Sequence, residues 1–378
     1  MKVVLISSVT PSGHYTQYLS HALNSQQNLY LTVYAGLHEK TSLKHSGRIK
    51  RVWHKSPQFI IDILNELKKD KPDIVHLQQE FNMYGGSTTA ILFPVLILLI
   101  RLSGFKTVVT VHAAVYKAQV NKKFVWLFNG KSYMKPFLLK LFFHYIYMCT
   151  GFFSHKVIAH TERKLNILTH DYSVNPNKIT IIPAIIPRRK PASLSRKPYF
   201  FYFGYMVRRK GIEELLVGFN SFIQKYPKPF YRLVMAGGTI RGQENALREI
   251  MDIIKKYGLT DRVTTVGFIE EAQQHKLYAE SIAVVIPSLV SFGYSGPLYH
   301  AFSYRKPVLA SNEGYFKEII KDLENGILVK KGGWSSSLRL ITKNKTLRTS
   351  IEKNILMQNS VQSPSHVAKQ YLKLYKSL

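Results

Sequence analysis

The first half of the chain alternates short apolar runs with longer segments of helical periodicity. The apolar runs have the length and continuity that a buried parallel strand requires. They cover residues 3–8, 29–34, 72–77, 106–112, 156–160 and 178–186. Helical patterns separate them: one ends at residue 23, others cover 59–69, 88–102 and 134–152, and one begins at residue 162. Strands that alternate with helices in this way predict a largely parallel sheet of the α/β class.

A change in composition divides the chain near its middle. Residues 187–198 are basic and rich in proline and have almost no apolar content, which is typical of a linker between domains. The α/β pattern then restarts, with strand candidates at 199–203, 232–236, 262–266, 283–287, 307–310 and 326–329. We therefore predict an N-terminal domain over 1–187 and a C-terminal domain over 198–362. An amphipathic helix over about 363–378 is expected to pack back on the first domain.

The net charge of the chain indicates what kind of partner it binds. The 378 residues include 53 Lys and Arg against 22 Asp and Glu, a formal net charge of +31, which favours a polyanionic partner. With 46% hydrophobic and 12% aromatic residues, the chain is not a disordered basic tail. No acid lies between Glu80 and Glu162, and this stretch also holds the most apolar segments. Basic and apolar character together favour an anionic membrane surface, and no nucleic acid is expected because no nucleic-acid-binding motif is present.

Other features narrow the class of protein. The longest uninterrupted apolar run, residues 91–100, is well short of the ~18–20 residues of a membrane-spanning helix. The N-terminus enters a strand pattern directly and lacks the cleavable region of a secretory signal. A single cysteine, Cys149, excludes a disulfide scaffold and a Cys-based zinc site and fits a reducing compartment.

The first segment with candidate chemistry follows the linker. Residues 201–216 place a strand, a turn at Gly204, the cations Arg208, Arg209 and Lys210, and then Gly211 at the start of a helix. A diphosphate requires such an arrangement, because free N–H groups at a helix start and cationic side chains both bind phosphate oxygens. A solvated basic turn is the alternative interpretation.

A second segment of this kind spans residues 287–311. A buried strand is followed by a loop of small residues, and Ser295, Gly296 and Pro297 then open a helix, with Ser295 or Gly296 as its cap. In open α/β sheets, ligands bind beyond the carboxyl ends of the strands. The alternative is an ordinary turn between a strand and a helix.

Taken together, the motifs resemble those of the family 4 (group 1) retaining glycosyltransferases, which have the GT-B fold. Besides the two segments above, the resemblance rests on residues 11–15, 73–76, 110–112, 178–187, 266–269, 311–320 and 325–329. It covers nearly the whole chain and depends on the order and spacing of the motifs. It implies two Rossmann-like doubly wound domains facing across a cleft, in which a nucleoside-diphosphate sugar is bound as co-substrate and no cofactor is needed.

The resemblance also implies roles for individual residues. Arg209 and Lys210, with Arg208 as an alternative, would hold the diphosphate, and His112 would contact the donor sugar. The donor-binding residues that it implies are Gly13, Arg208, Arg209, Lys210, Phe268, Ile269, Ser295, Gly296, Leu298 and His300. The leaving diphosphate is expected to help deprotonate the acceptor, so no protein nucleophile is required. No Asp-x-Asp pair occurs in the sequence, which argues against a metal site.

The chain departs from the family pattern at one place. The family carries two glutamates eight positions apart, where this chain has Phe292 and His300. A neutral His300 could still accept a hydrogen bond from the ribose. Glu313 is the nearest acid in the sequence and is predicted, with His112, as a catalytic residue. The missing acids leave a non-catalytic glycosyltransferase-like subunit, which binds glycan or lipid for a partner enzyme, as the alternative function.

The N-terminal domain is expected to bind the acceptor. Aromatic, aliphatic and basic residues mix over 124–153 as in a peripheral membrane anchor, with a buried helix as the alternative. The residues predicted to meet membrane or acceptor are Lys122, Lys123, Trp126, Phe128, Lys131, Lys135 and Lys140. We therefore expect a hexosyl-transferring enzyme of cell-surface polysaccharide or glycolipid assembly. It would be cytoplasmic, peripheral on the inner face of the membrane, and would act on a lipid-linked or glycan acceptor.

Overall fold

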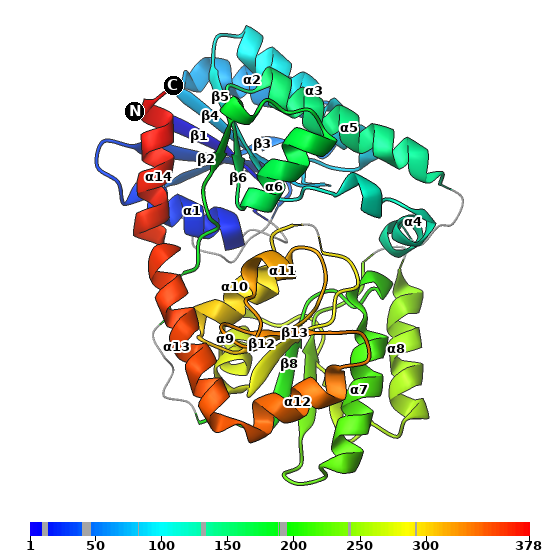
Figure 1. Cartoon of the computed structure of the whole chain (residues 1–378). Coiled ribbons are helices and arrows are strands. Elements are labelled where there is room, and N and C mark those ends of the chain that lie inside the picture. The colour runs from blue at the N-terminus through cyan, green and yellow to red at the C-terminus, as the bar shows by residue number, and fades with distance from the viewer. Residues whose placement is uncertain are drawn as a thin grey trace.

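A computed structural model of the chain has two α/β domains, one above the other in Figure 1. The structure describes residues 1–9, 14–39, 47–81, 83–129, 134–187, 189, 195–240, 243–291 and 293–378. The elements below, and every statement about which groups are present, refer to these residues.

The N-terminal domain is built on a seven-stranded sheet of order β3-β2-β1-β4-β5-β6-β7. Every neighbouring pair in it is parallel. The strands are β1 (Lys2–Ile6), β2 (Tyr30–Gly36), β3 (Arg48–Trp53), β4 (Ile74–Gln79), β5 (Lys106–Val111), β6 (Lys156–Ala159) and β7 (Ile179–Ile181). The main helices are α1 (His14–Asn24), α2 (Phe59–Asp70), α3 (Ser87–Leu102), α4 (Lys122–Asn129), α5 (Pro136–Phe153) and α6 (Glu162–Asn166).

Both faces of this sheet are buried, which explains why its central strands are continuously apolar. Along β1, Val3 and Leu5 belong to one core cluster and Val4 and Ile6 to the other, as the two-residue period of a strand requires. The first cluster includes residues of α1, and the second includes residues of α2, α3 and α5. The sheet is therefore covered by helices on both sides.

The C-terminal domain repeats this plan with a six-stranded parallel sheet of order β10-β9-β8-β11-β12-β13. Its strands are β8 (Tyr199–Phe203), β9 (Arg232–Ala236), β10 (Val263–Thr265), β11 (Ala283–Ile286), β12 (Val308–Ser311) and β13 (Ile327–Val329). Its helices are α7 (Ile212–Lys225), α8 (Glu244–Lys256), α9 (Glu271–Glu280), α10 (Gly296–Ser303), α11 (Phe316–Ile319), α12 (Trp334–Lys343) and α13 (Lys345–Val361).

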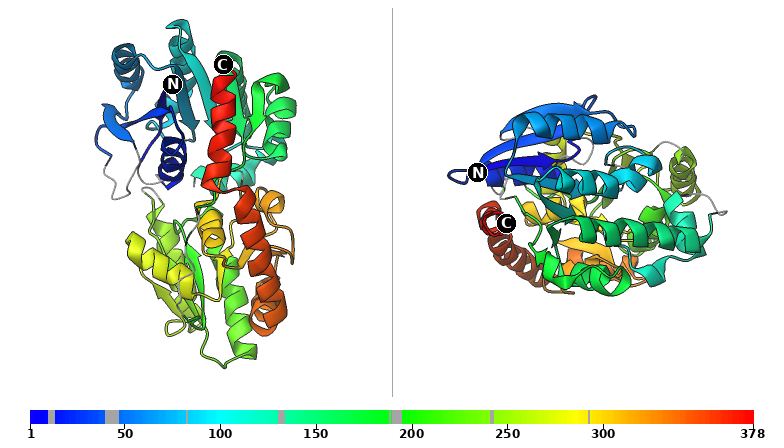
Figure 2. Two further views of the ribbon diagram at one scale, coloured as in Figure 1. Left: turned by 90° about the vertical axis from the view of Figure 1, so that its left-hand side faces the viewer. Right: turned by 90° about the horizontal axis from the view of Figure 1, so that it is seen from above.

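The last helix, α14 (Pro364–Lys376), returns to the N-terminal domain and packs against α1 (Figures 1 and 2). Its tyrosines are tied to that domain by buried hydrogen bonds. Tyr371 pairs with Tyr15 at 2.9 Å between hydroxyl oxygens, and the Tyr375 hydroxyl lies 2.6 Å from His76 Nδ1. The chain thus crosses between the domains twice.

The α/β class predicted from the sequence is confirmed, but two local predictions differ from the structure. Strand β3 has no counterpart among the predicted strands, because Arg48, Lys50 and Arg51 break its apolar pattern at the edge of the sheet. The strand predicted over 178–186 is paired only at β7, and Pro183 then interrupts it because proline has no N–H to donate.

One helix, α5, is long and apolar enough to cross a membrane, which the sequence analysis did not anticipate. One third of its residues are buried, and it packs against α3. Leu139, Phe143 and Ile146 face the domain core. The helix is thus a part of this domain with one side buried and the other exposed.

Candidate active site

A cleft of about 590 Å³ lies between the two domains, where the strands of both sheets end. Its lining includes residues that directly follow the carboxyl ends of strands from both domains. They are Ser7 after β1, Glu80 after β4, His112 after β5, Gly204 after β8 and Gly237 after β9. Doubly wound sheets bind ligands at this edge, so the position of the cleft follows from the topology.

The loop after β8 supplies the cations of the cleft. Residues Arg208–Lys210 form a short 3-10 turn, and Gly211 joins it to α7 with φ of +60°. A Cβ atom on Gly211 would lie 2.1 Å from the carbonyl oxygen of Pro287, so the turn requires glycine there. The tight turn sets Arg209 and Lys210 into the lining of the cleft.

Arg209 and Lys210 have no anionic side chain in contact with them. No hydrogen bond or ion pair of either side chain occurs in the described part of the chain. Burial lowers the pKa of both, and the charge of Arg209 also helps to lower the pKa of Lys210 to about 7. Two adjacent cations in a partly desolvated site are a strong attraction for a phosphate group.

Arg208 points elsewhere. Its guanidinium forms an ion pair with Glu249 of α8 and lies 5.6 Å from the ring centroid of Trp126 in α4. Arg208 does not line the cleft. The structure therefore brings Arg209 and Lys210 together in the cleft and gives Arg208 a contact between the domains.

The start of α10 lies on the same side of the cleft. Ser295 is its N-cap, and Ser295 and Gly296 both line the cleft, so the first N–H groups of the helix are available to an anion. His300 also lines the cleft and stacks on Tyr278, with ring centroids 5.8 Å apart. Leu298 is fully buried in the domain core and does not line the cleft.

Phe268 and Ile269, which follow β10, line the cleft as well. Phe268 is 74% exposed, and its ring centroid lies 6.3 Å from that of Tyr205. An exposed aromatic ring at the rim of a cleft offers a stacking surface.

His112 stands at the carboxyl end of β5, and protein atoms engage both nitrogens of its ring. Nε2 lies 2.6 Å from Oε1 of Gln78, and Nδ1 lies 3.3 Å from Nε2 of His160. Its carbonyl oxygen accepts hydrogen bonds from Lys164 Nζ at 2.7 Å and from the N–H of Tyr294 at 3.1 Å. Burial first, and then the nearby His160 and Lys164, hold the pKa of His112 well below its ordinary value. The imidazole is thus neutral and fixed in orientation.

Three predicted positions fall outside this arrangement. Glu313 is exposed in the loop after β12 and does not line the cleft. Gly13 and Phe292 lie outside the described residues.

The structure adds an acid that the sequence analysis did not select. Glu80 lines the cleft and is the only Asp or Glu among its described lining residues. The sequence gives one signal for it: Glu80 directly follows a buried strand, which is where ligand-binding residues of such sheets lie. Tyr15 and Tyr294 line the cleft beside His112; both lie in segments on which the resemblance rests, but neither was predicted as a site residue.

The predicted membrane residues lie on α4 and at the start of α5. Lys122, Lys123 and Lys135 are exposed, Lys140 is half-buried, and Trp126 is 42% exposed beneath Arg208. The side chain of Phe128 and the whole of Lys131 lie outside the described part of the chain. Several apolar side chains of α5 are exposed as well: Phe137, Leu138, Leu141, Met148 and Phe152.

Comparison with known proteins bears directly on this cleft. The model of the group 1 glycosyl transferases matches residues 186–356, and the model of glycosyltransferase family 4 matches residues 13–189. The two matches divide the chain at the linker and together span both domains. The chain belongs to the group 1 glycosyltransferases.

Individual relatives of this group 1 glycosyltransferase match it at low identity and over part of the chain. It is 30% identical over 171 residues, 42% of the chain, to the alpha-1,3/1,6-mannosyltransferase ALG2 of Dictyostelium discoideum. The match covers 39% of that protein, so the chain spans about two fifths of the length of this curated relative.

Solved structures match over the whole chain. Sucrose-phosphate synthase from Thermosynechococcus elongatus has a TM-score of 0.77 at 17% identity, covering 100% of this chain and 98% of that one. Anabaena HepE in complex with UDP and glucose has a TM-score of 0.75 at 14% identity, covering 100% of both chains. At these identities the likeness shows the fold, and the GT-B architecture expected from the sequence is confirmed.

Proposed function

We propose that this group 1 glycosyltransferase is a retaining enzyme of hexosyl type. In this proposal it transfers a sugar from a nucleoside-diphosphate sugar to a lipid-linked or glycan acceptor, in the assembly of a cell-surface polysaccharide or glycolipid. One observation carries the proposal: Arg209 and Lys210, without anionic partners among the described residues, share a cleft with the N-terminus of α10. This combination fits a diphosphate.

The proposed reaction replaces one bond at the anomeric carbon of the donor sugar. A bond forms between the acceptor oxygen and that carbon while its bond to the diphosphate oxygen breaks, and the acceptor proton passes to the leaving diphosphate. Arg209 and Lys210 stabilise the negative charge that develops on the diphosphate. The two cations supply this stabilisation without a metal ion or cofactor in the proposal. The domains hold donor and acceptor in register on either side of the cleft.

Binding of nucleotides to the purified chain tests this proposal. We expect at least one of UDP-glucose, UDP-galactose, UDP-N-acetylglucosamine and GDP-mannose to bind in isothermal titration calorimetry. Arg209→Ala and Lys210→Ala should each weaken binding of the matching nucleoside diphosphate about tenfold or more, since each removes a charge-assisted contact. Lys353→Ala, an exposed cation of α13, is the matched control. No binding by the wild-type chain, or undiminished binding by both cleft variants, would contradict the proposal.

We further propose that the enzyme acts as a peripheral protein at the cytoplasmic face of an anionic membrane. The exposed apolar residues of α5 support this. At 100° per residue, Phe137, Leu141 and Phe152 fall within a narrow arc on one side of the helix. Lys122, Lys123 and Lys135 lie exposed on α4 and just before α5, where an anionic lipid surface would attract them.

Vesicle flotation tests the membrane proposal. The chain should float with anionic vesicles at low salt, and replacing Phe137, Leu141 and Phe152 together by Ser should abolish flotation because the apolar contact is lost. The control replaces Leu356, Met357 and Val361, which are exposed apolar residues of α13 in the other domain, by Ser. Equal flotation of the two triple variants would rule out α5 as the contact.

A further inference from the structure

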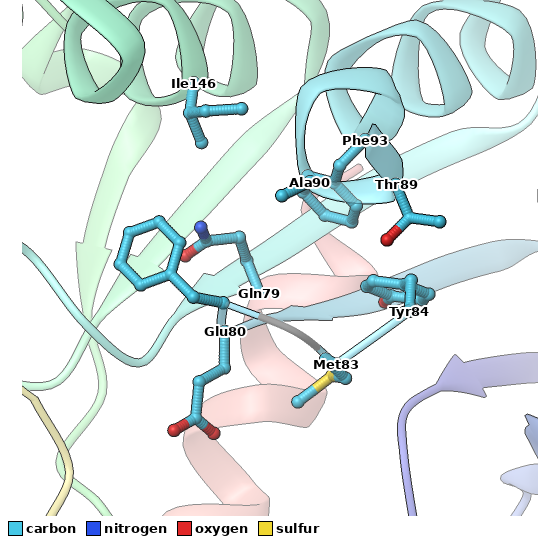
Figure 3. Close-up of a pocket in the computed structure, with 9 residues that line it drawn as sticks. Gln79, Glu80, Met83, Tyr84, Thr89, Ala90, Phe93 and Ile146 are labelled. Carbon is cyan, nitrogen blue, oxygen red and sulfur yellow. The ribbon is translucent and has the colours of Figure 1, made fainter. Parts of the chain in front are cut away.

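The reacting centre of a sugar transfer contains hydroxyl groups, and the described cleft contains one carboxylate. That carboxylate is Glu80, at the carboxyl end of β4. Figure 3 shows a small pocket of the N-terminal domain that Glu80 also lines, in which its carboxylate points away from the side chains of Ala90, Phe93 and Ile146. Glu80 also lines the cleft between the domains.

Glu80 has no partner that would account for its place. Its carboxylate forms no hydrogen bond or ion pair in the described part of the chain, and the side chain is solvent-accessible. The other acids near this edge differ: Glu39 is buried and binds Ser8, Val9 and Lys55. An unpartnered carboxylate inside a cleft carries four acceptor sites that only a ligand or water can use.

Glu80 shares the cleft with Arg209 and Lys210, the cations of the proposed diphosphate site. Desolvation by the surrounding protein raises the pKa of Glu80, while the positive charges of Arg209 and Lys164 act to lower it. Burial is the main cause of the raised pKa values of Tyr205 and Tyr294, which line the cleft in the C-terminal domain, and the charge of Glu80 raises both further. Glu80 and Arg209 line the same cleft from opposite domains, and their charges interact across it.

We propose that Glu80 accepts hydrogen bonds from hydroxyl groups of the sugar being transferred. This inference rests on the proposed function. The sugar is covalently joined to the diphosphate, so a diphosphate on Arg209 and Lys210 holds the sugar close to them. The phosphates themselves would be repelled by Glu80, whereas hydroxyl groups are donors that a carboxylate binds well. Among the described lining residues, no other side chain offers a carboxylate to that sugar.

The test compares a nucleoside diphosphate with its sugar-carrying form, by calorimetry on the full chain. The probe is whichever of UDP-glucose, UDP-galactose, UDP-N-acetylglucosamine and GDP-mannose the wild-type chain binds, alongside UDP or GDP. Glu80→Gln and Glu80→Ala should weaken binding of the sugar nucleotide about tenfold or more, because charged hydrogen bonds to the sugar are lost. Both variants should bind the nucleoside diphosphate at least as tightly as the wild type, because a like charge near the phosphates is removed. Asp252→Asn, which removes an exposed acid of α8 outside the cleft, should change neither affinity.

Each alternative outcome has a distinct meaning. If the wild-type chain binds none of these nucleotides, the proposed function itself fails. If it binds a sugar nucleotide and both Glu80 variants bind it equally well, the assignment of Glu80 is overturned while the proposed function stands. An equal loss of affinity for the nucleotide with and without the sugar also overturns it, because that result would mean a disturbed cleft. Glu80→Gln keeps the volume of the side chain, and its melting temperature checks that the fold is intact.

Discussion

Three of the described charged residues, Arg209, Lys210 and Glu80, reach the cleft from both domains. Arg209 and Lys210 follow a strand and precede a helix, and Ser295 and Gly296 open a helix, so short motifs sufficed to select them. Glu80 was missed because its one local signal, its place directly after a buried strand, is shared by the first residue after other strands of the sheet. Its significance comes from Arg209, which is 129 residues away and meets it only when the two domains face each other.

Arg208 and Leu298 show the converse limit of local motifs. Arg208 has the same charge as Arg209 and directly precedes it, but a turn of the backbone directs Arg208 to Glu249 and Trp126. Leu298 belongs to the helix that opens at Gly296, and its side chain is buried on the core side. Side-chain direction within a 3-10 turn or a first helical turn is a property of three-dimensional packing that the motif alone does not specify.

The lowered pKa of Lys210 leads to a prediction about how the affinity for a diphosphate depends on pH. Its pKa of about 7 in the cleft means that it loses its proton as the pH rises through 7. A bound diphosphate would favour the charged amine, so binding above pH 7 should take up a proton and weaken as the pH rises. Between pH 7 and 9 the affinity for UDP should fall by up to about tenfold per pH unit.

Calorimetry at several pH values, in two buffers of different ionisation enthalpy, measures both the affinity and the proton uptake. Lys210→Arg supplies a side chain that stays charged over this range, so it should remove the slope. A slope that persists in Lys210→Arg would show that another group titrates.

At the scale of the element, the periodicity of the sequence located most strands and helices, and the exceptions lie at edges. The central strands are continuously apolar because helices cover both faces of each sheet. Strand β3 has a neighbour on one side only, so it tolerates Arg48, Lys50 and Arg51 and gives no clear apolar signal. The apolar pattern of one strand does not show whether that strand lies at the centre or at the edge of the sheet.

Helix α5 explains part of the basic excess without any external partner. At its C-terminus, Lys178 Nζ donates to the carbonyl oxygens of Gly151, Phe152 and Ser154, and Arg101 donates to those of Phe152 and Phe153. Cations at this end satisfy the free carbonyl groups and the negative end of the helix dipole. Arg101 therefore stabilises the helix itself, whereas the exposed lysines on α4 and just before α5 are left for the proposed membrane contact.

At the scale of the whole molecule, the two domains are held face to face by contacts that the sequence motifs did not predict. Arg163 Nη1 donates to the carbonyl oxygen of Gly314 at 2.8 Å, and Thr161 Oγ1 donates to Glu318 Oε2 at 2.5 Å. Ala113 and Gly293 form an antiparallel bridge beside the cleft. These contacts fix which groups of one domain face the other, and they are the reason that Glu80 and Arg209 share one site.

The return of α14 to the N-terminal domain adds a second connection, and it yields a prediction about stability. The Tyr375 hydroxyl is 2.6 Å from His76 Nδ1, and both groups are buried. Burial lowers the pKa of His76 to about 3, so the ring is neutral and depends on this hydrogen bond rather than on charge. Tyr375→Phe leaves a ring nitrogen without its partner and should lower the free energy of unfolding by about 1–3 kcal/mol. Urea unfolding followed by tryptophan fluorescence and circular dichroism measures the change.

Tyr30→Phe is the matched control, because Tyr30 is 71% exposed. It should leave the urea midpoint within experimental error of the wild type.

His76 also contacts Thr110 and Gln78, and Gln78 contacts His112, so this chain of polar contacts leads from α14 to the cleft. Tyr375→Phe should therefore also reduce turnover of a bound nucleotide sugar, while its affinity for the nucleoside diphosphate, which we propose binds mainly to the other domain, stays unchanged. A loss of stability equal to that of Tyr30→Phe would show that the hydrogen bond between Tyr375 and His76 does not contribute to the attachment of α14.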